Sequence, residues 1–150
     1  MNISELQDFV ETSIPLIKQA GFVIRELNDQ EVVVTGEKRL NHNHHNTVFG
    51  GSISTILILS SWLMVRRLLE DTFPEASIVI ERQCTDFLVP VDGDFTARCA
   101  RPLPRQVESL KYGLDKLKRG RIDLGAALFQ DGSDHMAASF SGTFYCRLRL

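Results

Sequence analysis

The segment from Gly50 to Glu70 constrains the fold of this chain more than any other. Read as a helix, its first half carries apolar side chains on every side: Ile53, Ile56, Leu57, Ile58, Leu59, Trp62, Leu63, Met64 and Val65. A helix that is apolar all round has to be enclosed by other elements. The apolar stretch is interrupted by Thr55, Ser60 and Ser61 and is shorter than the roughly 20 residues of a membrane span. We therefore expect a buried core helix and no membrane association.

The rest of the sequence predicts one more helical region and the strands that enclose this helix. A first helix, with Ser4 as its cap, carries an apolar stripe, is broken near Pro15 and ends at Gly21. Alternating and β-branched residues predict strands over Phe22–Leu27, Glu31–Leu40, Ser77–Val89, Phe95–Arg101, Arg121–Gln130 and His135–Arg147. The segment Gln106–Lys118 fits helical spacing, but a strand is also compatible with it. The order predicts one α+β domain over residues 1–150, with an antiparallel sheet of five to seven strands around one long helix.

Composition narrows the class of protein. The chain has 150 residues, 43% hydrophobic and 24% charged, which is typical of a globular domain. A net charge of −2 gives no basis for nucleic-acid binding. Cys84, Cys99 and Cys146 are odd in number and form no CxxC pair, so we expect reduced thiols. The N-terminus lacks the basic and apolar regions of a signal peptide, and a cytoplasmic location is expected.

The candidate site is the loop from Asn43 to Ser52 that leads into the long helix. It ends in Gly50 and Gly51. The first N–H groups of a helix have no internal partners, and the helix dipole adds positive potential there. Glycine has no Cβ, so a ligand oxygen can approach the backbone closely. This arrangement suits a carbonyl oxygen that becomes negative during a reaction. A tight turn packed against a strand would use the same residues, and the spacing alone leaves both open.

The segment resembles the signature of hotdog-fold thioesterases, in which an Asn, a small residue and His-Gly-Gly precede the central helix. Asn43, Asn46 and Phe49-Gly50-Gly51 stand at those positions. Further along, Phe87–Asp94 looks like the family's strand that ends in a Pro-Val and Gly-Asp turn, and Lys118–Arg121 resembles its Gly-Arg strand entry. With its Phe-Gly-Gly-Ser and a tryptophan in the helix, the chain is similar to the stand-alone form of the YiiD C-terminal domain family of thioesterase-like proteins.

The resemblance implies a hotdog fold and an acyl thioester substrate, carried by coenzyme A or acyl carrier protein, with no further cofactor. It also implies a homodimer or a dimer of dimers with the site between two subunits. The N–H of Gly51, together with that of Gly50, would take the carbonyl oxygen, and Asn43 or Asn46 would orient the reacting group. The other expected substrate contacts are His44, His45, Phe49, Ser52, Ile53, Leu57, Ser60 and Ser61.

Two of these expectations have open alternatives. The hydroxyls of Ser60 and Ser61 would equally well bond back to the helix backbone. The histidines at 42, 44 and 45 also suit a solvated loop, and no nearby Cys or acid completes a tetrahedral set, so no metal is expected.

Two departures from the signature bear on mechanism. Phe49 replaces the usual His, and Ile58 stands where many relatives carry Asp. Glu70, the first acid in the helix, lies about 30 Å beyond Gly51. Hydrolysis uses a general base to activate water, and here a carboxylate such as Glu81 or Asp86 would have to arrive from another strand or subunit.

Thioester hydrolysis is the expected activity, with two alternatives. Decarboxylation of a malonyl thioester needs only an oxyanion site and a dry pocket that disfavours the carboxylate. The resemblance implies this activity too, as a malonyl-acyl-carrier-protein decarboxylase that supplies acetyl groups for fatty acid synthesis. The other alternative is a non-catalytic binder of acyl thioesters, which the missing helix carboxylate favours.

Basic residues concentrate between residues 98 and 121, where Glu108 and Asp115 are the acids. This patch would attract the phosphates of coenzyme A or the acidic surface of a carrier protein. A solvated rim is the alternative, and added salt distinguishes the two because it weakens charge-driven binding. The candidate contacts are Arg98, Arg101, Arg119 and Arg121.

Overall fold

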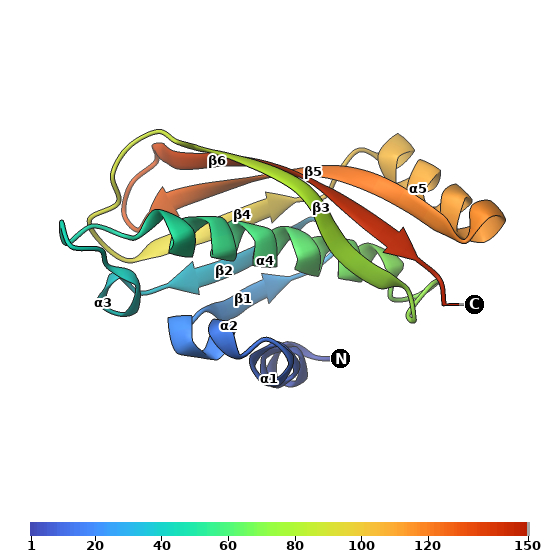
Figure 1. The fold of residues 1–150 in the computed structure, drawn as a ribbon, viewed down its shortest axis with the longest axis horizontal. Helices are drawn as coiled ribbons and strands as arrows, with labels where there is room; N and C mark the ends of the chain where they lie inside the picture. The colour runs from blue at the N-terminus through green and yellow to red at the C-terminus, as the bar shows by residue number, and fades with distance from the viewer. Residues whose placement is uncertain (150) are drawn as a thin grey trace.

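One antiparallel sheet curves around the long helix that begins at Gly50 (Figure 1). The computed structural model describes residues 1–149. Its helices are α1 (Ile3–Ser13), α2 (Pro15–Ala20), α3 (Lys38–Asn41), α4 (Gly50–Leu69) and α5 (Pro104–Leu117). Its strands are β1 (Val23–Leu27), β2 (Glu31–Gly36), β3 (Ser77–Phe87), β4 (Phe95–Ala100), β5 (Arg119–Gln130) and β6 (Met136–Arg147). The six strands lie in the order β1-β2-β4-β5-β6-β3, which confirms the predicted α+β architecture.

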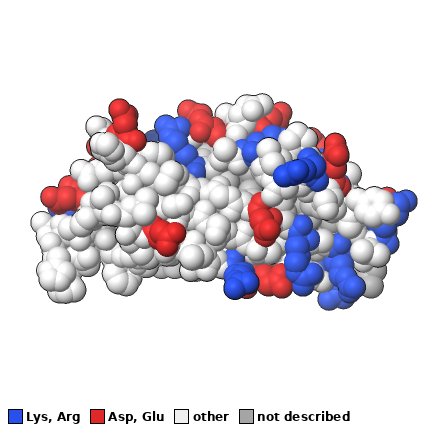
Figure 2. All heavy atoms as spheres, turned by 90° about the horizontal axis from the view of Figure 1, so that it is seen from above, with Lys and Arg blue, Asp and Glu red and all other residues white. Residues whose placement is uncertain are grey.

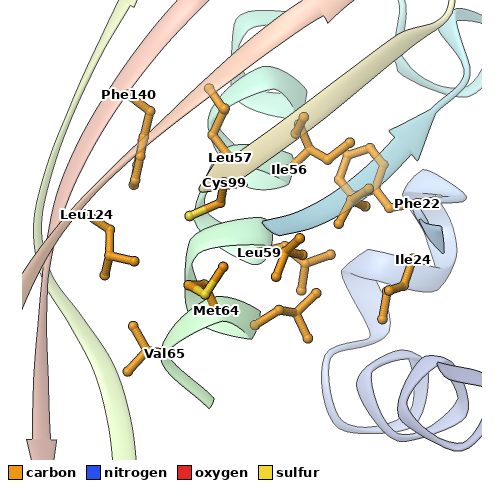
Figure 3. Packing of buried hydrophobic residues seen from close by; sticks show 14 of the residues in the cluster. Phe22, Ile24, Ile56, Leu57, Leu59, Met64, Val65, Cys99, Leu124 and Phe140 are labelled. Carbon is orange, nitrogen blue, oxygen red and sulfur yellow. The ribbon is translucent and has the colours of Figure 1, made fainter. Parts of the chain in front are cut away.

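Helix α4 forms the centre of the hydrophobic core. It packs against all six strands, and apolar side chains from α4 meet others from β1, β4, β5 and β6 in Figure 3. By length and composition alone α4 could cross a membrane, but 61% of its apolar window is buried inside the fold. Burying one large aliphatic side chain stabilises the fold by about 1.5–3 kcal/mol. The all-round apolarity of α4 is therefore accounted for by the sheet that surrounds it.

The N-terminal helices differ from the prediction at the cap. Asn2, rather than Ser4, caps α1: its Oδ1 accepts from the N–H of Glu5 at 2.8 Å, and the Glu5 carboxylate accepts from the N–H of Asn2 at 3.0 Å. This reciprocal capping box satisfies two backbone donors at once. The break at Pro15 is confirmed, since α2 begins there, and Gly21 ends α2 in the left-handed region with φ 69°.

The second strand is shorter than predicted. β2 ends at Gly36, and Lys38–Asn41 form α3 instead of continuing to Leu40 as a strand. The backbone N–H of Lys38 donates to Asp94 at 2.9 Å, and the Lys38 ammonium pairs with Asp92. These contacts with the loop before β4 draw the chain out of the sheet. As a result Asn41 is buried at the end of α3, close to the start of α4.

The ambiguous segment Gln106–Lys118 lies in helix α5 up to Leu117. Since β4 pairs with β5 only over the second half of β5, from Ala127 to Gln130, the first half has a free edge on that side. Helix α5 packs there: the Gln106 side chain donates to the Asp123 carbonyl at 3.1 Å, and Gly113 lies against Arg119. Covering an edge in this way protects it from pairing with other chains.

Candidate active site

Two backbone hydrogen bonds hold the residues that precede α4. The N–H of Val48 donates to the carbonyl of Val91 at 2.8 Å, and the N–H of Phe49 donates to the carbonyl of Asn41 at 2.7 Å. No side chain caps the helix. Within residues 1–149 the N–H groups of Gly50 and Gly51 donate to no protein acceptor. The start of α4 therefore presents two backbone donors, with the positive end of the helix dipole behind them.

Each of the two glycines lies beside an aromatic ring. The ring of Phe49 covers Gly51 so closely that a β-carbon built on Gly51 would collide with it. A β-carbon on Gly50 would sit 3.5 Å from the ring of Phe87, which is ordinary contact. The Phe49 side chain itself is 56% exposed. Only Gly51 therefore requires glycine for steric reasons in the present conformation.

A cleft of about 420 Å³ opens beside Gly51, between α2, α3 and the first turns of α4. Its walls are apolar with a few neutral polar groups, and none of the lining residues is ionisable. They are Leu16, Gln19, Ala20, Phe22, Leu40, Asn41, Phe49, Gly51, Ser52 and Thr55. An uncharged cleft beside free N–H groups suits a neutral ligand that brings a carbonyl oxygen.

Asn43 organises the loop before the helix. Its Oδ1 accepts from the N–H of His45 at 2.9 Å and from the N–H and hydroxyl of Thr47 at 3.1 and 3.2 Å. Its Nδ2 donates to the Thr47 hydroxyl at 3.0 Å. The side chain is thus engaged within its own loop, and its predicted catalytic role stays a prediction.

Asn46, His44 and His45 lie at the exposed tip of the same loop. Asn46 has φ 60°, a left-handed conformation that Asn adopts more readily than most residues. The rings of His44 and His45 lie against each other with centroids 3.9 Å apart. None of the three lines the cleft beside Gly51. In the described part of the chain, no group of three His, Cys, Asp or Glu side chains is placed to hold a metal ion.

Four of the predicted substrate contacts lie in the core. Ile53 and Leu57 are buried against the sheet, and Ser60 and Ser61 are fully buried. Both serine hydroxyls donate to the carbonyl of Leu57, at 3.0 and 2.8 Å, which is the backbone-bonding alternative. Phe49 and Ser52 do line the cleft. The structure thus brings together Gly51, Phe49 and Ser52 and keeps the other four away from the cleft surface.

The basic candidates lie away from the glycine pair. The two ends of β3 lie beside different turns of α4. Near its start, the carbonyl of Ile78 accepts from the indole N–H of Trp62, twelve residues into α4, and at its other end Phe87 contacts Gly50. Arg121 pairs across β6 with the start of β3 and is therefore roughly 18 Å along α4 from Gly50. On the face drawn in Figure 2, Lys and Arg are more frequent towards the right-hand end, whereas α4 begins at the left-hand end in Figure 1. None of these arginines lines the cleft beside Gly51, and their contact with phosphates or with a carrier protein stays a prediction.

Most of these arginines are already paired. Arg121 binds the Glu81 carboxylate at 2.7 Å and lies over the Tyr145 ring, and this hydrogen bond lowers the pKa of Glu81. Arg98 pairs with Glu31, and Arg101 donates to the Asp29 carbonyl at 3.4 Å. Glu81, named above as a possible base, is therefore held as a carboxylate by its own subunit.

Seven of the ten residues that line the cleft were not predicted from the sequence, and Asn41 is the buried polar residue among them. It is 5% exposed, lines the cleft and holds the N–H of Phe49. The sequence carries three asparagines in this region, and the resemblance selects the two nearer the glycines. Asn41 directly follows the predicted strand Glu31–Leu40, and a polar residue at a strand end can belong to a site. The sequence does not predict helix α3, which places Asn41 in the cleft.

The family profile described as "Putative thioesterase (yiiD_Cterm)" matches residues 3–147. This chain belongs to that family. The match confirms the resemblance found in the Phe-Gly-Gly segment, and it covers the whole sheet together with α4. A thioesterase-type hydrolase role is supported at this coarse level.

Solved structures share the fold of this chain. A protein of unknown function from Chlorobaculum tepidum is 20% identical, with a TM-score of 0.90 over 97% of this chain and 94% of its own. A "putative thioesterase" from Shewanella oneidensis is 25% identical, with a TM-score of 0.83 over 98% and 97%. A thioesterase from Haemophilus influenzae is 12% identical, with a TM-score of 0.75 over 97% and 90%. The chain has the hotdog fold of thioesterases.

Proposed function

We propose that this protein hydrolyses acyl thioesters of coenzyme A or acyl carrier protein, as a cytoplasmic homodimer without a further cofactor. The observation that carries the proposal is the pair of unpartnered N–H groups at Gly50 and Gly51, beside an uncharged cleft, in a member of a thioesterase family. Its three cysteines are unpaired, which agrees with a reducing compartment.

In the proposed reaction the thioester carbonyl oxygen accepts hydrogen bonds from the N–H groups of Gly51 and Gly50. Water attacks the carbonyl carbon, and negative charge develops on the oxygen that these donors stabilise. The carbon–sulfur bond then breaks, the acid leaves, and the sulfur takes up a proton. Removing one oxyanion donor from such a site typically reduces the rate by about 10²–10³.

Water activation is the step for which the cleft offers no side chain, because none of its lining residues is ionisable. A base supplied by a second copy of the chain would complete the site. Strand β3 is an edge strand, and exposed apolar residues stand at its last position, Phe87, and directly after it at Leu88 and Val89. An edge of this kind pairs readily with another chain, so the proposed homodimer joins through β3 next to Gly50.

The absence of a base from the described cleft also favours a second candidate, decarboxylation of a malonyl thioester. In that reaction the bond to the terminal carboxylate breaks and carbon dioxide leaves. The electron pair forms an enolate whose oxygen the same N–H groups stabilise, and a proton from solvent completes the acetyl product. No step requires a base to activate water.

One assay separates these activities. Purified protein is incubated with malonyl and long-chain acyl thioesters, and free thiol and product mass are measured. Release of thiol supports hydrolysis. Loss of carbon dioxide with the thioester intact supports decarboxylation. Tight binding without either product would overturn both and leave a non-catalytic acyl-thioester binder.

A further inference from the structure

The side chain of Asn41 has one hydrogen-bonding atom without a partner. Its Nδ2 donates to the carbonyls of Ala20 and Glu37, both at 2.9 Å. Two carbonyl acceptors on one side of the amide fix which atom is nitrogen and which is oxygen. Within residues 1–149 nothing donates to Oδ1, although Asn41 is 95% buried and lines the cleft beside Gly51.

Asn41 Oδ1 is not among the buried atoms without a partner and is therefore accessible from the cleft. A ligand that fills the cleft and covers Oδ1 has to supply a donor, because an acceptor that is buried without one is unfavourable. Here the acceptor belongs to a residue whose backbone carbonyl binds Phe49, one residue before the glycine pair. The cleft thus combines two kinds of group close together: backbone donors at the start of α4 and a side-chain acceptor on its floor. A ligand that satisfies both has to carry a carbonyl oxygen and, a short distance away, a donor.

We propose that Oδ1 of Asn41 accepts a hydrogen bond from the amide N–H of the pantetheine arm while the thioester carbonyl lies at Gly51. This inference rests on the proposed function. The amide nearest the sulfur lies two methylene groups away from it, so the arm carries an acceptor and a donor in the required order. The arm is uncharged in this region, as is the cleft.

Other parts of an acyl thioester fit Asn41 less well. A hydrocarbon chain has no donor and would leave Oδ1 unsatisfied. A carboxylate brings only acceptors, and its charge would be desolvated in a cleft without a cationic side chain. The side chain of Asn41 therefore selects the arm rather than the acyl group, and the acyl group extends from Gly51 in another direction.

The test uses an uncleavable analogue in which a methylene replaces the thioester sulfur, so that the ketone still reaches Gly51. Affinity is measured by calorimetry for two versions of the truncated arm, one with the amide N–H and one with N–CH₃. We expect N-methylation to weaken binding by about tenfold, which corresponds to about 1.4 kcal/mol. A change below about twofold overturns the inference. If neither version binds, the proposed function fails as well, so the two failures are distinguishable.

Variants assign the effect to Asn41. Asn41→Asp keeps an acceptor and should keep the preference for N–H, whereas Asn41→Ala should remove it. Both variants leave the carbonyls of Ala20 and Glu37 without a donor, and in Asn41→Asp a carboxylate oxygen also faces them, so the folding of both variants is checked by circular dichroism. Gln19→Ala and Ser52→Ala remove two other polar side chains of the cleft. They should retain the preference, and its loss in either would overturn the assignment even when Asn41→Ala does not fold.

Coenzyme A and acyl carrier protein share this arm. The same ketone analogue is therefore titrated on both carriers. Binding by either carrier at least as tightly as by the truncated arm supports the inference and identifies the source. Binding of both carriers more than about tenfold weaker than the truncated arm would overturn it, because the cleft would then have no exit for the rest of the arm.

Discussion

The N–H of Phe49 donates to the backbone carbonyl of Asn41 at 2.7 Å. This bond joins the end of α3 to the residue before α4 and keeps Phe49 extended, with φ −63° and ψ 134°. Phe49 is the extended residue directly before α4, and its side chain does not cap the helix. The N–H groups of Gly50 and Gly51 therefore donate to no protein acceptor that the structure describes. The free donors of the site thus depend on a contact with a short helix that forms outside the sheet.

Substitution of Gly51 tests the oxyanion site. In Gly51→Val the side chain collides with the Phe49 ring and occupies the position of the incoming carbonyl. We expect kcat/KM for an acyl thioester to fall by about 10²–10³ while the protein stays folded. Gly125→Val is the matched control, because Gly125 lies on an exposed stretch of β5 with only the Phe140 carbonyl near its β-carbon position. Near-normal turnover in Gly51→Val would contradict the assignment.

Variants of Asn46 distinguish a role in the loop backbone from a role in catalysis. Its φ of 60° suits glycine, so Asn46→Gly should keep both stability and turnover, whereas Asn46→Ala should lose about 1 kcal/mol of stability. Thermal unfolding and steady-state kinetics check both variants. If Asn46→Gly folds normally but loses turnover, the amide of Asn46 acts on the substrate, as the resemblance to hotdog thioesterases implies.

The loop bonds of Asn43 predict a different outcome. Asn43→Ala removes the acceptor for His45 and Thr47 and should lower the melting temperature as well as turnover. Asn43→Asp keeps the acceptor and should restore most of the stability. Full stability of Asn43→Ala, measured by differential scanning fluorimetry, would show that these bonds do not hold the loop.

The buried thiols predict a loss of stability at high pH. Burial raises the pKa of Cys99, despite an opposing hydrogen bond with Ser61, and that of Cys146, each to about 12 from an ordinary 9.0. Above pH 9 the unfolded chain releases these protons and the folded chain does not. The free energy of unfolding that the two thiols contribute is therefore fully present below pH 9 and is lost between pH 9 and 12. Denaturant unfolding across this range should show a shallower decline in Cys99→Ala.

The same thiols predict selective labelling. In the native protein at pH 8 an alkylating reagent should modify Cys84, which is exposed, and leave Cys99 and Cys146 unmodified. In denaturant all three should react. Mass spectrometry counts the modified cysteines, and rapid native labelling of Cys99 would mean that the β4 side of the core opens readily.

The β3 edge predicts the oligomeric state. Leu88→Glu places a charge within the exposed apolar segment that follows β3 and should halve the mass measured by light scattering and abolish turnover. Leu117→Glu is the control, since Leu117 is 65% exposed at the end of α5. A dimer that survives Leu88→Glu but is lost in Leu117→Glu would place the interface on α5 instead.

Much of the fold was predictable from local pattern. The apolar run from Ile53 to Val65 predicted an enclosed helix because its period leaves no polar face, and alternation predicted the strands to within a few residues. Where the predicted second strand ran too far, and where helix and strand were both left open, a distant partner decided the outcome. Lys38 binds Asp92 and Asp94, so the chain turns away from the sheet after β2. The segment after Pro104 forms a helix that packs against the free edge of β5.

For the site, the sequence by itself determined the glycine pair at the start of α4 and the absence of an acid near it in the helix, since both follow from residue order along one element. Only the tertiary structure decided which neighbouring asparagine reaches that site. Asn43 and Asn46 are closer to Gly51 in sequence, but Asn43 bonds within its loop and Asn46 occupies the loop tip. Asn41 lines the cleft because α3 packs beside α2 and α4, and such long-range packing is not encoded in spacing along the chain.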